Sequence, residues 1–500
     1  MAPLPGERPR SPARALGAAL ARWAGAAALA LSACFNPGPA PTGASDFVPG
    51  QVIVGYRPAS DRAALRDEFG VLRAVPLGES SELWVLPAGH DPLAVSRRVR
   101  GVRFSQPNYV RRIQAYQASE FDPAVPAKDN PLWHLAVVQA NQAWGVDRPA
   151  TLRTFAADNP PGKPIMVAVV DSGVDVRHPD LAANIARDAS GSVRYFDEIS
   201  VCGSPPTDEL APPGASRLNF NYATAYSDAA HPGPDGNGHG THVAGIIAAL
   251  GNNQPGVECK EPPCNTVGLG PGVSILPVKT MNALGDGNDF CIARGLRDAA
   301  DAGARVINLS VGGPQPGPAL EEAIEYLAAR GALLVVASGN DGLRVNYPAA
   351  YPGAIAVGAV GHPADAGYPE ALSKGAQYSS SGPELDLVAP GGSDTADCPE
   401  RKCGVYSTVP TYTSDIVIVG KVVGTGYGRL TGTSMATPQV SAVAALILSR
   451  EPNLSAAQVR QRLVATAVAV PGTGGAFTDR FGYGLLNPLG ALSQVSHDGK

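Results

Sequence analysis

The sequence predicts an α/β protein with a central parallel sheet, preceded by a small α+β unit. Residues 130–490 alternate apolar strand-like segments with helix-like segments. The strand-like segments, such as 164–170 (PIMVAVV) and 354–360 (AIAVGAV), are apolar almost throughout, which is typical of strands buried on both faces. Residues 47–113 contain shorter, mixed segments. A parallel sheet needs helical crossovers, so we expect helices on both of its faces.

The N-terminal unit, residues 47–113, is expected to contain strands at 51–56 and 82–86, because both segments are rich in β-branched or aromatic side chains. Helices are expected at 62–69 and 92–99, and a strand followed by a turn at 102–110. A unit of this size buries little apolar surface by itself. We therefore expect it to depend on a partner domain to stay folded.

The large domain is expected to contain strands and helices in alternation. The strands are predicted at 164–170, 273–279, 305–309, 332–337, 354–360 and 385–389. The helices are predicted at 239–250, 290–302, 319–330, 434–449 and 455–465. Sheets of this kind bind ligands at the carboxyl ends of their strands. The polar residues that follow the strands are therefore the candidates for function.

The first 34 residues differ in composition from the rest of the chain. Four arginines precede a short apolar segment, 23–31, which ends in Leu31-Ser32-Ala33-Cys34. A charged region, an apolar region and a cleavage site with small residues form an export signal. The ending resembles that of a bacterial lipoprotein signal, in which the cysteine is lipidated, here Cys34. The alternative is an ordinary secretory signal cleaved nearby. Residues 35–46, rich in Pro, Gly and Ala, are expected to form a flexible linker.

Composition limits the classes of partner. The chain has 500 residues, 44% of them hydrophobic, and a formal charge of −5. This charge gives no reason to expect a nucleic-acid partner. No other segment is long and apolar enough to cross a membrane, so we expect membrane contact only through the signal or a lipid anchor. We expect a monomer in the extracellular space or the cell envelope.

The seven cysteines favour disulfides if the protein is exported. Apart from Cys34, they are Cys202, Cys259, Cys264, Cys291, Cys398 and Cys403. Cys259–Cys264 and Cys398–Cys403 are candidate local pairs, which leaves Cys202 with Cys291; sequence alone leaves the connectivity open. Zinc is the rival interpretation, but no Cys-x-x-Cys spacing and no nearby histidine support it.

Three polar residues lie where catalytic groups are expected. Asp171 follows the strand 164–170, His239 opens a helix, and Ser434 opens an almost wholly apolar helix among small residues. Each has a plainer interpretation by itself: Asp171 as a turn residue, His239 as a helix cap or, with His242, a metal ligand, and Ser434 as a cap. Together they form a nucleophile, a base and an orienting acid, because a serine hydroxyl needs a base within hydrogen-bond reach.

The segments DSGVD (171–175), HGTHVAG (239–245) and GTSMATP (432–438) resemble the three active-site motifs of the subtilisin-like serine proteases, the subtilase family or peptidase family S8. The resemblance covers most of residues 130–490 and includes HPDL, INLSVGG, VVASGN and SSSGPELDLVAPGG in the family's order. It implies a subtilisin-like three-layer domain with Asp171, His239 and Ser434 as the catalytic triad, and a structural role for His242.

The same resemblance implies further site residues. Asn340 and the backbone N–H of Ser434 would form the oxyanion hole, where charge develops during acyl transfer. A strand would pair with the substrate backbone, and a pocket would receive the residue before the cut. The strand consists of Ser310, Val311 and Gly312, and the pocket of Ser338, Gly339, Asp341 and Asn346.

The segments VPGQVIVGY and FSQPNYVRR in the N-terminal unit resemble the inhibitory propeptide of this family. We therefore expect residues 47–113 to be the protein's own inhibitor, which is removed by self-cleavage in the linker 114–130. The peptidase domain would span 131–490 and a tail 491–500.

The resemblance implies no cofactor for catalysis and only a partial calcium site, with Asp180 and Asn253 as ligands. An insertion at 257–266 departs from the family pattern at that loop. The sequence thus predicts an exported serine endopeptidase that acts on proteins or peptides through an acyl-enzyme. The alternatives are a catalytically silent, peptide-binding relative and an esterase with the same triad.

Overall fold

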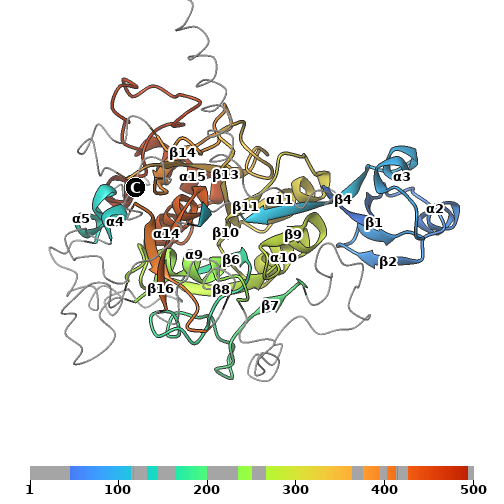
Figure 1. Ribbon diagram of the computed structural model, residues 1–500, viewed down its shortest axis with the longest axis horizontal. Helices are drawn as coiled ribbons and strands as arrows, with labels where there is room; N and C mark the ends of the chain where they lie inside the picture. The colour runs from blue at the N-terminus through green and yellow to red at the C-terminus, as the bar shows by residue number, and fades with distance from the viewer. Residues whose placement is uncertain are drawn as a thin grey trace, which may run out of the picture. The chain divides into compact units, whose positions relative to one another are not determined.

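The computed structural model describes residues 46–113, 116–117, 132–144, 165–199, 235–250, 266–362, 375–393, 403–412, 414 and 426–493 (Figure 1). All of them fall in one compact unit. The expectations for the signal 1–34, the linker 35–45 and most of the linker 114–130 lie outside the described residues. So do those for Cys34, Cys202, Asn253, Cys259, Cys264 and Cys398.

The large domain is built on a sheet of seven strands in which every neighbouring pair is parallel. In spatial order they are β14 (Leu387–Pro390), β13 (Ala354–Val360), β12 (Leu333–Ala337), β10 (Val306–Leu309), β6 (Met166–Asp171), β8 (Ser274–Lys279) and β7 (Phe196–Asp197). All residues of β10, β12, β13 and β14 are buried, which requires cover on both faces. The predicted fold class is confirmed.

The five long helices described in the large domain begin and end close to the predicted positions, whereas the three shorter ones are not predicted by the sequence. The long helices are α9 (His239–Ala248), α10 (Asp289–Asp301), α11 (Pro318–Ala329), α14 (Thr433–Arg450) and α15 (Ala456–Ala465), and the shorter ones are α4 (Trp133–Val137), α5 (Ala140–Ala143) and α16 (Pro488–Ser493). Helix α14 packs against α9 and the central strands, while α10 packs against α11. Residues 433–448 of α14 are all buried, as expected for a helix that is apolar all round. Among the described residues, no helix combines the length and apolarity needed to cross a bilayer.

The N-terminal unit contains an antiparallel sheet with two helices. The strands are β1 (Phe47–Gly55), β2 (Arg73–Pro76), β3 (Ser81–Val85) and β4 (Phe104–Ile113), and the helices are α2 (Arg62–Glu68) and α3 (Pro92–Arg98). Successive side chains of a strand point to opposite faces. Val52 and Val54 accordingly lie in a core with Trp84, whereas Ile53 lies in the core of the large domain. The unit therefore shares one face with the large domain, which agrees with its small size.

Strand β4 extends beyond the predicted end at residue 110 and joins the two parts. Its last residues pair antiparallel with β9 (Asp286–Asn288) on one side and with β11 (Val311–Gly312) on the other (Figure 1). A further two-residue strand, β5 (Tyr116–Gln117), pairs with β16 (Tyr427–Thr431), which also pairs with β15 (Val405–Thr408). Local sequence does not reveal these pairings, because the partners lie far away along the chain.

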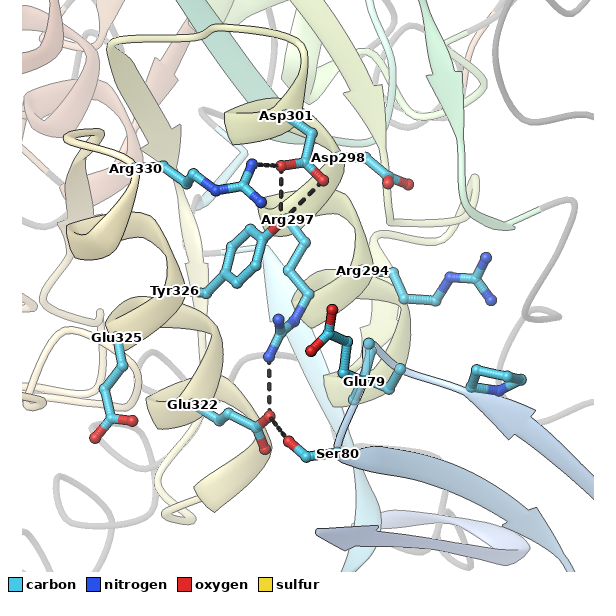
Figure 2. A pocket seen from close by; sticks show the side chains of 13 residues that line it. Glu79, Ser80, Arg294, Arg297, Asp298, Asp301, Glu322, Glu325, Tyr326 and Arg330 are labelled. Carbon is cyan, nitrogen blue, oxygen red and sulfur yellow. Dashed lines mark hydrogen bonds and ion pairs between the residues drawn. The ribbon is translucent and has the colours of Figure 1, made fainter. Parts of the chain in front are cut away.

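A second contact between the two parts centres on Glu322 of α11. Its carboxylate accepts hydrogen bonds from the hydroxyls of Ser80 (3.2 Å) and Ser81 (2.9 Å) and pairs with Arg103 (2.8 Å) and Arg297 (3.1 Å). Figure 2 shows Ser80 and Arg297 bound to this side chain, while Glu325 on the same helix points away from Arg297. Glu322 is largely buried. If its hydrogen-bond partners were removed, water could therefore not easily reach the carboxylate to take their place.

We predict that Glu322→Ala loosens the segment 77–81 on the large domain. Hydrogen bonds to a buried charged group are worth more than neutral ones, so amide exchange in this segment should speed up about tenfold or more. The measurement is hydrogen exchange by mass spectrometry on full-length protein carrying Ser434→Ala, which keeps the chain intact if self-cleavage occurs. Glu325→Ala, an exposed residue of the same helix, is the matched control. Equal exchange in the two variants would contradict the assignment.

Candidate active site

The residues that the sequence singles out gather at the carboxyl edge of the parallel sheet. Asp171 is the last residue of β6, and Ser310 directly follows β10. His239 is the first residue of α9, and Ser434 is the second residue of α14. All four are fully buried. The first turns of α9 and α14 thus lie at the edge of the sheet where the parallel strands end.

Asp171 and His239 are in direct contact. The His239 Nδ1 lies 2.8 Å from Asp171 Oδ1. Because a carboxylate can only accept, Nδ1 is the donor, and the neutral imidazole then carries its lone pair on Nε2. Asp171 Oδ1 also accepts the backbone N–H of Ser172 at 2.7 Å. The His239 Nε2 is buried and has no hydrogen-bond partner among the described residues. It is therefore the basic atom of the pair.

Gly240 is what allows this contact. A Cβ at this position would lie 2.0 Å from the carbonyl oxygen of Gly173 and 3.1 Å from the Asp171 Cβ. Any side chain would push α9 away from β6. The small residue after His239 in the sequence is therefore explained by close backbone approach.

Asp235 is a positioning residue that the sequence analysis missed. Its carboxylate accepts the Ser172 hydroxyl (2.8 Å), the N–H of Gly238 (2.7 Å), and the N–H (2.8 Å) and hydroxyl (2.6 Å) of Thr241. It thereby ties the residue after Asp171 to the start of the helix that carries His239. Burial raises the pKa of Asp235, and these hydrogen bonds and the charge of Lys279 oppose the rise. An Asp shortly before a helix start is a known capping signal, and it could have indicated this role.

Ser434 and Ser310 hold each other reciprocally. The Ser434 Oγ donates to the Ser310 carbonyl at 2.9 Å, and the Ser310 Oγ donates to the Ser434 carbonyl at 3.2 Å. Pro438 lies inside α14 and has no N–H, so the carbonyl four residues before it, that of Ser434, lacks its helical donor. The Ser310 hydroxyl supplies the missing hydrogen bond.

The structure does not join Ser434 to His239 by a hydrogen bond among the described residues. The Ser434 hydroxyl is directed to Ser310 instead. A serine side chain exchanges staggered rotamers about one bond. Hydrogen bonds between catalytic groups are often long or poorly aligned until substrate binds. The structure therefore contains the Asp171–His239 pair and, at the start of α14, Ser434, whose hydroxyl donates to the Ser310 carbonyl and not to His239.

Asn340 is bound to Thr433, the residue that precedes Ser434. Its Oδ1 accepts both the backbone N–H and the hydroxyl of Thr433, each at 2.9 Å. Because Thr433 N–H must donate, the amide oxygen faces Thr433 and the Nδ2 group lies on the opposite side of the amide. Helix α14 thus fixes which way this side chain is turned.

The other expected substrate residues lie around the same edge. Val311 and Gly312 form β11, which pairs with β4. The backbone N–H of Asn346 donates to the Ser338 carbonyl, and a Cβ on Gly339 (φ 117°) would lie 2.4 Å from the Asn346 Nδ2, so these three are closely packed. The Asp341 carboxylate accepts the Ser380 hydroxyl at 2.6 Å.

His242 points to a different part of the fold. Its Nε2 lies 3.0 Å from the Val405 carbonyl and 3.3 Å from that of Gly428, which connects α9 to β15 and β16. Burial, reinforced by the charge of His239, lowers the pKa of His242 to about 3.

Within the described parts of the chain, no three His, Cys, Asp or Glu side chains gather in a way that could hold a metal ion.

The expected calcium ligand Asp180 is buried, and its Oδ2 accepts the Tyr427 hydroxyl at 2.8 Å and the Thr266 N–H at 3.2 Å. Asn253 lies outside the described residues, so the calcium site stays a prediction.

Cys291 and Cys403 are both disulfide-bonded. Their expected partners, Cys202 and Cys398, lie outside the described residues, and the pairing also stays a prediction.

A parallel sheet that carries an Asp–His pair and a serine at a helix start along one edge defines a hydrolase of the serine type. Comparison with known proteins identifies the family. The model of the subtilase family matches residues 162–484, so the chain belongs to this family and is a serine endopeptidase by class.

Individual relatives agree. M-protease of Shouchella clausii (strain KSM-K16) is 35% identical over 373 residues, 74% of this chain and 74% of that protein. Subtilisin Savinase of Lederbergia lenta is 35% identical over 347 residues, 69% of this chain and 96% of that protein. The crystal structure of fervidolysin from Fervidobacterium pennivorans, a keratinolytic enzyme related to subtilisin, matches 90% of this chain with a TM-score of 0.62 and 25% identity. This chain covers 61% of the length of fervidolysin.

The buried histidines predict acid destabilisation. Burial lowers the pKa of His134 and of His242 to about 3, whereas in the unfolded chain a histidine titrates near its ordinary value of about 6.5. The unfolded state therefore binds more protons between these values, and stability is lost as the pH falls from about 6.5 towards 3.

The measurement is the free energy of unfolding in urea of the Ser434→Ala protein between pH 7 and 4. Each buried histidine should add a slope on the order of 1 kcal/mol per pH unit. His242→Asn should reduce the slope, and His90→Asn, at an exposed histidine, should leave it unchanged. The same slope in the His242→Asn and His90→Asn proteins would contradict this account.

Proposed function

We propose that this protein is a secreted serine endopeptidase that cleaves peptide bonds through an acyl-enzyme and processes its own N-terminal unit. The observation that carries the proposal is the strand pairing of residues 110–113 and of residues 116–117. Residues 110–113 add as a strand to β9 and β11, of which β11 directly follows Ser310, and residues 116–117 add to β16, which ends at Thr431 shortly before Ser434. An extended peptide that adds to strand edges is a general mode of peptide recognition.

In the proposed reaction the Ser434 Oγ attacks the carbonyl carbon of the bond while His239 Nε2 takes its proton. Asp171 keeps the imidazole in the required tautomer through its 2.8 Å contact with Nδ1 and stabilises the imidazolium. The proton then passes from His239 to the leaving amine. Water then attacks the acyl-enzyme carbonyl while His239 Nε2 takes its proton, and this proton passes to the Ser434 Oγ as the ester bond breaks and the acid product leaves.

The oxyanion that forms during this attack is proposed to be bound by two donors. One is the backbone N–H of Ser434, which belongs to the first turn of α14 and has no helical acceptor. The other is the Asn340 Nδ2, since its Oδ1 is occupied by Thr433. Donors fixed in advance stabilise developing charge without reorganisation.

The strand register also suggests which bond is cut first. In the β4–β11 pair, Arg112 lies opposite Gly312 and Ile113 opposite Val311. We propose that a bound substrate continues this register by one residue, so that Gln114 would pair with Ser310, whose carbonyl accepts the Ser434 hydroxyl. The chain pairs again at Tyr116, opposite Thr431. Gln114 and Ala115 lie outside the described residues, and we propose the bond between them as the site of self-cleavage.

Export is part of the proposal and rests on the sequence of residues 1–34. The resemblance to a lipoprotein signal supports lipidation of Cys34, and an oxidising compartment agrees with the disulfides of Cys291 and Cys403. The cleaved N-terminal unit is proposed to act as the enzyme's own inhibitor, since β4 occupies the strand edges that a substrate would use. A catalytically silent binding protein is the alternative, and a serine-directed probe separates the two.

We predict that the purified protein hydrolyses casein and is labelled at Ser434 by a fluorophosphonate. Asp171→Asn should lower the rate by roughly 10⁴-fold, the scale expected when the histidine loses its orienting carboxylate. Ser434→Ala should show neither cleavage nor labelling. An intact, folded protein with no labelling would establish the silent alternative.

We predict that self-cleavage releases a fragment that ends at Gln114 and leaves a new N-terminus at Ala115. Intact mass and N-terminal sequencing at early times measure both ends before further trimming. The Ser434→Ala protein, purified alone, should remain uncut. A cut at the same bond in that variant would show that another protease makes it.

A further inference from the structure

One ion pair between the N-terminal unit and the large domain is completely buried. The Arg111 Nε lies 2.5 Å from Asp289 Oδ1, and its Nη2 lies 3.0 Å from Asp289 Oδ2. Both side chains have no exposed surface. Such a two-point contact between a guanidinium and a carboxylate fixes both the charge and the geometry of the partner.

The surroundings of Arg111 in the large domain offer acceptors to the rest of the guanidinium. Its Nη1 donates to the carbonyl oxygens of Gln315 (2.8 Å) and Gly313 (3.3 Å). A Cβ on Gly317 would lie 2.3 Å from Asp289 Oδ2 and 3.0 Å from Arg111 Nη2. The wall of this pocket is therefore formed by backbone that leaves room for a planar group and has carbonyls directed to it.

Among the described residues, the side-chain hydrogen bonds of Asp289 come from the N-terminal unit. The donors are Arg111 and Gln106, whose Nε2 donates to Oδ2 at 3.0 Å. Removal of the N-terminal unit takes both donors away. A carboxylate then remains in the first turn of α10, next to two backbone carbonyls.

The position of Arg111 relative to the cut connects this pocket to substrate choice. Arg111 lies opposite Gly287 in β9, three residues before Gln114. It is thus the fourth residue before the bond assigned to Ser434. A substrate that adds to β9 and β11 in the same register would place its own fourth residue over Asp289.

We propose that Asp289 makes this endopeptidase selective for substrates with arginine at the fourth position before the cut. The inference rests on the proposed function and on the register given above. Arginine supplies the planar fork of donors that the pocket accepts, whereas lysine presents a single compact charge. An aliphatic residue leaves the carboxylate and the carbonyls unpaired, and an unpaired buried polar group is costly.

The neighbouring residue Arg112 provides an internal comparison. It pairs with Asp286 at 3.1 Å, but the two side chains are 45% and 27% exposed. An exposed ion pair of this kind contributes little. The third position before the cut should therefore show weak selectivity, and Asp286 serves as the matched control for Asp289.

The experiment compares quenched fluorogenic peptides that span residues 108–118 on the matured wild-type enzyme. Relative to the native peptide, Arg111→Leu should lower kcat/KM about tenfold or more, with Arg111→Lys in between, while Arg112→Leu should change it less than about threefold. In the Asp289→Asn enzyme the kcat/KM values of the native and Arg111→Leu peptides should differ by less than about twofold. In the Asp286→Asn enzyme the difference between these two peptides should persist.

The outcomes separate this inference from the proposed function. Cleavage of the native and Arg111→Leu peptides with equal kcat/KM, or cleavage at a different bond, would overturn the role of Asp289 while leaving an active peptidase. Absence of cleavage of every peptide and of fluorophosphonate labelling would overturn both. If Asp289→Asn does not fold, the kcat/KM values of the native, Arg111→Leu and Arg112→Leu peptides on the wild-type enzyme still test whether arginine is preferred at the fourth position.

Discussion

The strand formed by the end of β4 between β9 and β11 is the constraint on which much of the structure depends. Residues 110–113 supply hydrogen-bond partners to two strand edges of the large domain, and unpaired edges tend to acquire a partner. The same strand fixes the N-terminal unit on the large domain and buries Arg111 against Asp289. It also ends beside β11, the strand that directly follows Ser310. Backbone pairing thus sets the position of the N-terminal unit, and the buried Arg111–Asp289 ion pair adds a side-chain contact to it.

The catalytic edge depends on backbone geometry to a similar degree. Gly240 lets α9 approach β6 so closely that His239 reaches Asp171. Pro438 leaves the Ser434 carbonyl without a helical donor, and Ser310 takes its place. Asp235 fixes the two loops relative to each other through Ser172 and Thr241. None of these residues would react with substrate, yet each determines where a reacting group lies.

The sequence predicts the buried elements well and the short edge strands poorly. Apolar character and length are local signals, so the sequence predicts strand 354–360 with its observed bounds and α14 to within one residue at each end. β9 and β11 contain two or three residues each, and only distant pairing defines them. The resemblance to a family supplied β11 and the catalytic residues, whereas no local signal separates Asp289 from an ordinary residue of a helix first turn. Its partner Arg111 is 178 positions away in the sequence.

The central proposal is that the chain is its own first substrate at Ser434. The most direct test is a crystal structure of the full-length Ser434→Ala protein with clear density for residues 113–116. We expect the Gln114 carbonyl oxygen within about 3 Å of both the Asn340 side-chain nitrogen and the backbone nitrogen of residue 434. A Gln114 carbonyl turned away from these donors, at more than about 5 Å and with no ordered water between, would contradict the account.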